Sequence, residues 1–224
     1  MHVGAAALKP RKSPVQTRSA LTVDALHAAT IQVLIREGLA RCTTTRIAER
    51  AGTSVGTLYQ YYPNRDALLC AVLERHLEAI AAEVERTCRE HRNRTVGEMA
   101  SALVTAFLAA KLSDPNQARA RALYAVSEER DGAALADRMH SRIIAAVAAM
   151  LSTARDAAFD DPAIVASVAL QALVGPVLAL LKRQAKPGSW DRIQDELILL
   201  VTAYFQTYRA ESVPPRKQAG RARR

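Results

Sequence analysis

The chain of 224 residues has few of the residue types that build disulfide frameworks, metal knuckles and β-sheets. Its three cysteines are an odd number for a disulfide set and lie too far apart for a metal knuckle. Aromatic residues make up only 4% of the chain, and alanine and leucine far outnumber the β-branched residues. This composition predicts helix nearly everywhere, and therefore an all-α fold.

The sequence also lacks the short motifs of common enzyme classes. None of its five histidines belongs to an HExxH pattern, and neither a GxSxG motif nor a phosphate-cradling glycine loop is present. The first residues have no apolar core long enough for a secretory signal. We therefore expect a cytoplasmic protein that is not an enzyme and that binds no metal and no cofactor.

Positive charge is concentrated at the two ends of the chain, whose net charge is +9. Residues 1–65 contain nine Lys and Arg against three Asp and Glu, and residues 210–224 contain five against one. Residues 66–209 are near neutral, with seventeen against eighteen. This distribution is expected of a phosphate-binding module, although a basic surface without a specific partner is the alternative. We expect a flexible basic arm at 1–17 and a basic disordered tail at 211–224.

The segment TTTRIAERAGTSVGTLYQYYPNRDALL at residues 43–69 has the pattern of two short helices joined by a tight turn. Thr44 can cap the first helix, Gly52 can take the left-handed conformation that ends it, and Ser54 can cap the second. Asn64 can cap a third helix after the proline that ends the second. This layout is typical of a helix-turn-helix, whose second helix enters the major groove of DNA.

The run IAERAGTSVGTLYQYYPNRDALL resembles the N-terminal signature of the TetR-type bacterial transcription regulators, and residues 21–38 fit the first helix of that family. The resemblance covers roughly residues 18–80. It implies a three-helix helix-turn-helix domain at 18–64 and a fourth helix, from about residue 64, that bridges the domains. A helical domain for ligand binding and dimerisation is then expected at 65–210.

The resemblance also implies which residues contact DNA. The two threonines at the start of the first motif helix are expected to meet phosphate, the opening of the recognition helix to face base edges, and two tyrosines and an arginine to bind phosphates. These residues are Thr44, Thr45, Val55, Gly56, Thr57, Tyr59, Tyr61 and Arg65. Leu58 and Tyr62 are expected to point inward. The family commonly has phenylalanine at the position of Tyr62, whose additional hydroxyl is a further candidate for a DNA backbone contact.

Helical periodicity continues beyond the motif. An apolar stripe from Asn64 to Val84 predicts one long helix shared by both domains, followed by a charged connection from Arg86 to Arg94. Further helices are predicted from Val96 to about Ser113–Pro115, at 116–128 and at 133–155, with the last two separated around Arg130–Gly132.

Residues 162–181 carry no charge and are long enough to span a membrane. Ser167, Gln171 and the Gly175-Pro176 pair weaken that interpretation, so we favour burial between the core and a partner subunit. An amphipathic helix follows at 189–208. In the resembling family the last two helices of each subunit pair, which implies a homodimer with these interface residues: Val168, Leu173, Val177, Ile193, Leu197, Leu200 and Tyr204.

Methionine and aromatic side chains of the C-terminal region suit an apolar ligand, although they also commonly fill a core. The candidate effector-pocket residues are Met99, Phe107, Tyr124, Met139, Met150 and Trp190. The predicted function is that of a dimeric repressor that binds a palindromic operator in double-stranded DNA and is released by a small apolar or amphipathic effector. The alternatives are a regulator without an effector and a membrane-anchored DNA-binding sensor that uses 162–181 as its span.

Overall fold

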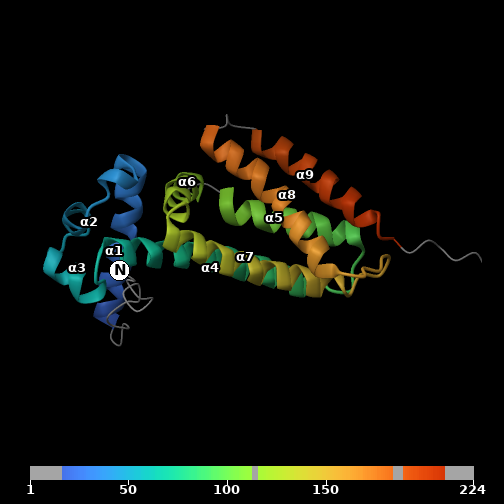
Figure 1. The fold of residues 1–224 in the computed structure, drawn as a ribbon, viewed down its shortest axis with the longest axis horizontal. Coiled ribbons are helices and arrows are strands. Elements are labelled where there is room, and N and C mark those ends of the chain that lie inside the picture. Colours follow the sequence, from blue (N-terminus) through green and yellow to red (C-terminus); the bar gives the residue numbers. More distant parts are fainter. Residues whose placement is uncertain (1–16, 113–115, 184–188, 210–224) are drawn as a thin grey trace, which may run out of the picture.

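The computed structural model describes residues 17–112, 116–183 and 189–209, and the regular elements in these ranges are all helices. The prediction of an all-α fold is confirmed. Three helices form a head at one end of an elongated protomer, and the remaining helices form a bundle that extends away from it (Figure 1). The expected basic arm and tail lie outside the described residues, apart from the first residue of the helical head, Thr17.

The head has its own hydrophobic core. Its elements are α1 (Thr17–Glu37), the short 3-10 turn η2 (Leu39–Arg41), α2 (Thr44–Arg50) and α3 (Val55–Tyr61). Leu26, Val33, Ile47 and Leu58 meet in this core with exposed fractions of 4% or less, so each of the three helices contributes an apolar face. Burial of a leucine or isoleucine side chain stabilises the fold by about 1.5–3 kcal/mol, so these contacts hold the three helices together.

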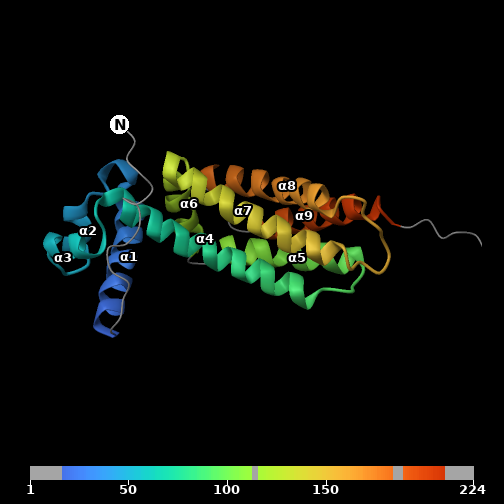
Figure 2. The same cartoon turned by 60° about the horizontal axis from the view of Figure 1, so that its bottom comes forward.

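Helix α4 (Arg65–Glu90) belongs to both the head and the bundle (Figure 2). Its first turns place Leu69 and Val72 in the head core, whereas Ile80 and Val84 lie in the bundle core. The helix runs further than the sequence predicted, because the expected connection from Arg86 is helical to Glu90. The Arg86 guanidinium binds the Glu90 carboxylate at 2.6 Å, one helical turn away, and such pairs stabilise an exposed helix face.

The bundle packs around a second core. It consists of α5 (Val96–Leu112), α6 (Asn116–Ser127), α7 (Arg130–Leu151), α8 (Pro162–Arg183) and α9 (Ser189–Gln206). Helix α4 packs on α5 and α7, α8 packs on α7, and α9 packs on α5 and α8. Phe107, Met150 and Phe205 are among its largest fully buried side chains. The predicted end of α5 near Ser113–Pro115 falls outside the described residues.

Gly132 lies inside the first turn of α7, so the predicted break at Arg130–Gly132 is wrong. The chain instead turns at Glu128 and Glu129. A β-carbon on Gly132 would lie 2.1 Å from the carbonyl oxygen of Val126 at the end of α6. The glycine therefore permits the close approach of α7 to α6, a requirement that is invisible in the sequence because it depends on tertiary contact.

Helix α8 has one buried and one exposed apolar face. The segment Pro162–Lys182 is long and apolar enough to cross a membrane by length and composition, and 39% of its most apolar window is buried inside the protomer. Val165, Leu173 and Val177 are packed into the bundle core, whereas Ile164 and Val168 remain 61% and 49% exposed. The protomer's own core thus covers only one face of this helix.

Candidate DNA-binding interface and effector cavity

The first helix of the motif is capped one residue earlier than predicted. Thr43 has an extended conformation, and its hydroxyl accepts a hydrogen bond from the backbone N–H of Arg46 at 3.4 Å. Thr44 is already helical, and its hydroxyl oxygen lies 3.3 Å from that of Tyr59 in α3. The Thr44 side chain therefore connects the two helices of the motif, while Thr45 beside it is exposed.

The turn between α2 and α3 has the geometry predicted for a glycine. Gly52 has a φ of 66°, the left-handed region that residues with a β-carbon rarely adopt. The N–H of Gly52 donates to the carbonyl of Glu49 at 3.1 Å, and that of Thr53 donates to Ala48 at 3.0 Å. These two bonds form a Schellman motif, which satisfies carbonyls at the end of α2 and turns the chain sharply toward α3.

Helix α3 divides its side chains between the head core and the surface. Ser54 caps it by accepting a hydrogen bond from the N–H of Thr57 at 3.0 Å. Leu58 is fully buried, and Tyr61, one turn later, is only 9% exposed, so the expected phosphate contact of Tyr61 depends on a small remaining surface. Tyr59 is 42% exposed, and Gln60 beside it is also exposed, although no feature of the motif singled out Gln60.

The opening of α3 is open to solvent around Gly56. Val55 and Thr57 are half-buried, whereas Gly56 is exposed. A β-carbon on Gly56 would meet only the Ser54 hydroxyl oxygen, at an ordinary 3.6 Å, and its φ is not positive. Nothing within the described residues therefore requires glycine at this position, whose absent side chain leaves room for a close approach from outside.

Arg65 has a structural role within the head. Its guanidinium donates to the carbonyl oxygen of Leu39 in η2 at 3.3 Å and lies 3.8 Å from the Asp66 carboxylate. Its Nε is buried and has no hydrogen-bond partner among the described residues. Part of the charge remains accessible, with 37% of the side chain exposed. Arg65 therefore fixes the turn between α1 and α2 in addition to any phosphate that it binds.

The hydroxyl of Tyr62 points into the head rather than toward its surface. Tyr62 is 2% exposed, which confirms the expected inward packing, and its hydroxyl lies 2.7 Å from Nε2 of the buried His27. Burial raises the pKa of Tyr62 to about 12 and lowers that of His27 to about 4, so both groups are neutral at pH 7. The expectation that this hydroxyl could reach a DNA backbone is wrong, because the hydroxyl forms a hydrogen bond inside the head.

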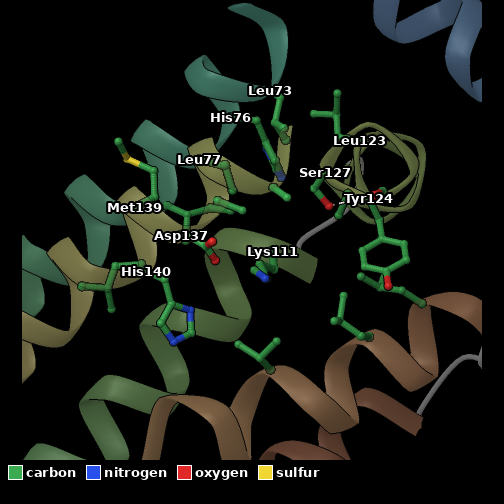
Figure 3. A pocket seen from close by; sticks show the side chains of 18 of the residues that line it. Leu73, His76, Leu77, Lys111, Leu123, Tyr124, Ser127, Asp137, Met139 and His140 are labelled. Atoms are coloured by element: carbon green, nitrogen blue, oxygen red, sulfur yellow. Dashed lines mark hydrogen bonds between the residues drawn. The ribbon is translucent and has the colours of Figure 1, made fainter. Parts of the chain in front are cut away.

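A cavity of about 330 Å³ lies among α4, α5, α6, α7 and α8 (Figure 3). Its wall is mainly aliphatic. The cavity touches the head core directly, because Leu73 of α4 and Leu123 of α6 belong to that core and also line the cavity. Its volume is near the lower end of the range for small-molecule sites.

Three of the six expected pocket residues line this cavity: Phe107, Tyr124 and Met139. Met99 and Met150 are fully buried in the bundle core and do not reach the cavity, and Trp190 packs against the core elsewhere. The sequence did not single out Lys111, His140 or His76 as pocket residues. All three line the cavity, and His76 is 7% exposed. Only the packing of five helices brings these polar groups together.

The seven residues expected at the dimer interface fall into three groups. Val168 and Leu200 are about half exposed and available to a partner. Ile193 and Tyr204 are half-buried against the protomer's own core. The expected interface role of the remaining three residues is wrong, because their side chains are buried in that core with exposed fractions of 3% or less: Leu173, Val177 and Leu197. The exposed leucine that the sequence interpretation missed is Leu199, at 65%.

The cysteines are free thiols with little access to solvent. Cys42 and Cys88 are buried and Cys70 is half-buried. Burial raises the pKa of Cys42 to about 11 and that of Cys88 to about 12, which keeps both in the unreactive thiol form. No group of three or more metal-ligating His, Cys, Asp or Glu side chains occurs among the described residues.

A capped helix-turn-helix with an exposed second helix, carried on an all-helical bundle with an internal cavity, defines a DNA-binding regulatory protein. Comparison with protein families agrees. Residues 26–72 match the family described as bacterial regulatory proteins, tetR family, and residues 95–205 match the tetracyclin repressor-like C-terminal domain. The chain therefore belongs to the TetR family of transcription regulators, which are not enzymes, and the resemblance inferred from the motif is confirmed.

Individual relatives are similar over different parts of the chain. The transcriptional repressor KstR of Mycolicibacterium smegmatis is 38% identical over 58 residues, which span 26% of this chain and 28% of that protein. A TetR-family regulator from Mesorhizobium loti has a TM-score of 0.69 at 19% identity, covering 87% of this chain and all of that one. SmeT, the repressor of a Stenotrophomonas maltophilia multidrug efflux pump, has a TM-score of 0.66 at 19% identity, with 86% and 92% covered. These structures share the fold.

Proposed function

We propose that this protein is a cytoplasmic, homodimeric repressor that places two copies of α3 in the major grooves of a palindromic operator. The exposed opening of α3 around Gly56 supports the role of this helix, because a recognition helix contacts base edges with its N-terminal residues. Tyr59 and Thr45 are exposed and Arg65 is partly accessible, so in this proposal they supply phosphate contacts.

The proposed dimer forms through the outer faces of α8 and α9. Ile164 and Val168 on α8 and Leu199 and Leu200 on α9 are exposed by 49–65%, which is unusual for large apolar side chains on two neighbouring helices. Covering these faces with the same helices of a second copy gives a self-complementary, two-fold interface. The same pairing would cover the exposed apolar face of α8, so this helix would not need a membrane to bury it.

The proposed effector response begins in the cavity. Leu73 and Leu123 line it and are buried in the head core, so a ligand that displaces α4 or α6 also displaces the support of α2 and α3. DNA half-sites lie about one helical turn, or a multiple of it, apart. A shift of α4 by a few ångströms therefore changes the separation of the two α3 helices and weakens operator binding. A coupling of roughly 1–3 kcal/mol would be typical.

Selection of bound DNA from random duplexes tests this function first, because a dimer of this kind should recover two-fold-symmetric sites. Calorimetry with a panel of apolar and amphipathic compounds, repeated with the selected operator, then tests the response. The coupling must be reciprocal: bound operator should weaken the affinity for the ligand by the same factor by which bound ligand weakens the affinity for the operator. Ligand binding that is indifferent to operator would leave a regulator without effector control. Failure to select any DNA would refute the function itself.

A further inference from the structure

Lys111 is a cation that lines the cavity, and it has no ion-pair partner among the residues that the structure describes. It lies in the last turn of α5, and its ammonium nitrogen is 4.9 Å from the ring centroid of Phe107. Figure 3 shows its side chain among those of Asp137, His140 and Tyr124, which come from α7 and α6.

The remaining polar groups of the cavity wall do not neutralise this cation. His76 of α4 is buried, and burial lowers its pKa to about 4, so it is a neutral hydrogen-bonding group at pH 7. His140 of α7 lies 3.1 Å from the side-chain nitrogen of Gln171, and burial also lowers its pKa. Asp137 and Glu128 line the cavity but are exposed, so water screens their charges. The wall contributed by α8 is aliphatic, with Leu170, Val174, Leu178 and Leu181.

The Lys111 ammonium is destabilised by its surroundings. Part of the Lys111 side chain is accessible from the cavity, but protein atoms surround it closely, and this desolvation lowers its pKa to about 8. The lysine is still mainly protonated at pH 7. The Phe107 ring offsets part of the desolvation through its negative face but carries no net charge. A ligand that brings an anionic group to Lys111 would offset more of this desolvation cost.

We propose that the cavity binds an amphipathic anion, in its simplest form a carboxylate with a compact apolar body, and that the carboxylate pairs with Lys111. The aliphatic walls from α4 and α8 would receive the apolar body, and His76 and His140 would supply hydrogen bonds to the head group. A cationic ligand would instead add a second positive charge beside an unpaired one. The effect of this ligand on DNA rests on the proposed function, whereas its binding does not.

Calorimetry on the DNA-free, full-length protein can test the ligand class with straight-chain probes of matched length that end in a carboxylate, an alcohol or an amine. A charge-assisted hydrogen bond contributes about 1.5–3 kcal/mol, so the carboxylate should bind roughly 10- to 100-fold more tightly than the alcohol. The amine should bind more weakly still. Lys111→Met should reduce the carboxylate's advantage to within about twofold while alcohol binding persists, since the apolar walls are unchanged.

Two controls separate the charge of Lys111 from its bulk. Lys111→Arg should retain the preference for carboxylate, and Asp137→Asn should retain or increase it because it removes a neighbouring negative charge. Near pH 8, carboxylate binding should take up protons as Lys111 becomes fully charged, and this uptake should vanish in Lys111→Met. Because His76, His140, Asp137 and Glu128 face the same space, the Lys111→Met comparison is needed to assign the proton to Lys111.

The proposal is overturned if the alcohol or amine binds as tightly as the carboxylate, or if Lys111→Met keeps the carboxylate preference. It is also overturned if carboxylates of every chain length fail to bind. Lys111-dependent binding that leaves operator affinity unchanged would support the ligand class and refute the effector response. Release of operator only by uncharged compounds would refute the ligand class and leave the proposed function intact.

Discussion

Nε2 of His27 in α1 lies 2.7 Å from the hydroxyl oxygen of Tyr62, the residue that ends α3. This hydrogen bond joins the first helix of the head to the end of the proposed recognition helix inside a hydrophobic core. His27 Nδ1 is also buried and has no partner among the described residues. The Tyr62 hydroxyl is thus a stabilising group of the head, and two predictions depend on it.

Removing the hydroxyl should destabilise the protein without changing its electrostatic contact with DNA. Tyr62→Phe leaves His27 with an unsatisfied buried nitrogen, which costs about 1–3 kcal/mol. Urea unfolding should report this loss, and the salt dependence of DNA affinity should stay constant. The double variant His27→Leu/Tyr62→Phe should lose less than the sum of the single variants, because it removes both partners. A reduced salt slope in Tyr62→Phe would show instead that the hydroxyl reaches phosphate.

The two buried histidines should make stability depend on pH in a defined window. Burial lowers the pKa of His27 and of His76 to about 4, from an ordinary value of 6.5, so the unfolded chain binds more protons between these values. Stability should be fully present above pH 6.5 and fall as pH decreases toward 4, by an amount of the order of 3 kcal/mol for each histidine. Arg75 lowers the pKa of Asp24 below 3.8, so its contribution is lost at lower pH.

Urea denaturation at several pH values measures this window, and His76→Leu should flatten it by about half. His76 faces Arg119 and Lys111, which repel its protonated form, whereas His27 faces Arg75, Asp24 and Arg119. Stability that is constant from pH 6.5 to 4.5 would show that the histidines are solvated.

Gly56→Ala should weaken DNA recognition without destabilising the fold. Alanine is more favourable than glycine within a helix by about 1 kcal/mol, and the added β-carbon meets no close contact in the protein. The variant should therefore melt at the same or a higher temperature yet bind the selected operator less tightly. Gly97→Ala in α5 is the matched control, since its β-carbon would meet only Thr202 at 3.9 Å. Unchanged operator affinity in Gly56→Ala would remove the opening of α3 from the interface.

Tyr59→Phe should weaken binding to all DNA sequences alike. Tyr59 is 42% exposed, and its hydroxyl lies beside that of Thr44 at the junction of α2 and α3, where phosphate is expected. A phosphate contact carries no sequence information, so its loss should lower the affinity for selected and for random duplexes by the same factor. Filter binding or fluorescence anisotropy on both duplexes measures it. A loss confined to the selected site would assign Tyr59 to base recognition.

Charge on the outer face of α8 should split the proposed dimer. Val168→Glu places a carboxylate at the proposed two-fold contact, where an unpaired buried charge costs several kcal/mol, yet it leaves the protomer core intact. Sedimentation should show folded monomers. Leu21→Glu, at an even more exposed leucine of α1 (65% against 49% for Val168), should remain dimeric, whereas Leu173→Arg should unfold the protomer because Leu173 is 0% exposed. A folded dimer in Val168→Glu would exclude this face.

The local structure of the head could be predicted from the order of its residues. The caps at Ser54 and Asn64 and the turn at Gly52 were predicted correctly, because each depends on the side chain or φ of a single residue. The length of α4 was underestimated, since the charged residues after Val84 looked like a connection. Tertiary packing of Thr87 and Cys88 and surface pairs of Arg86 extend that helix.

Which side of each bundle helix faces the core, the cavity or the solvent depends on how the helices pack and could not be predicted from the sequence. Helix α8 is apolar on all sides, so periodicity could not distinguish Leu173, which is buried in the protomer, from Val168, which is exposed. The sequence did not single out Lys111. It became a candidate ligand contact because helices distant in sequence enclose the cavity that its side chain lines. Capping is a local interaction, so it can be predicted from neighbouring residues. Burial depends on which distant segments pack against a residue, and these contacts cannot be predicted from local sequence.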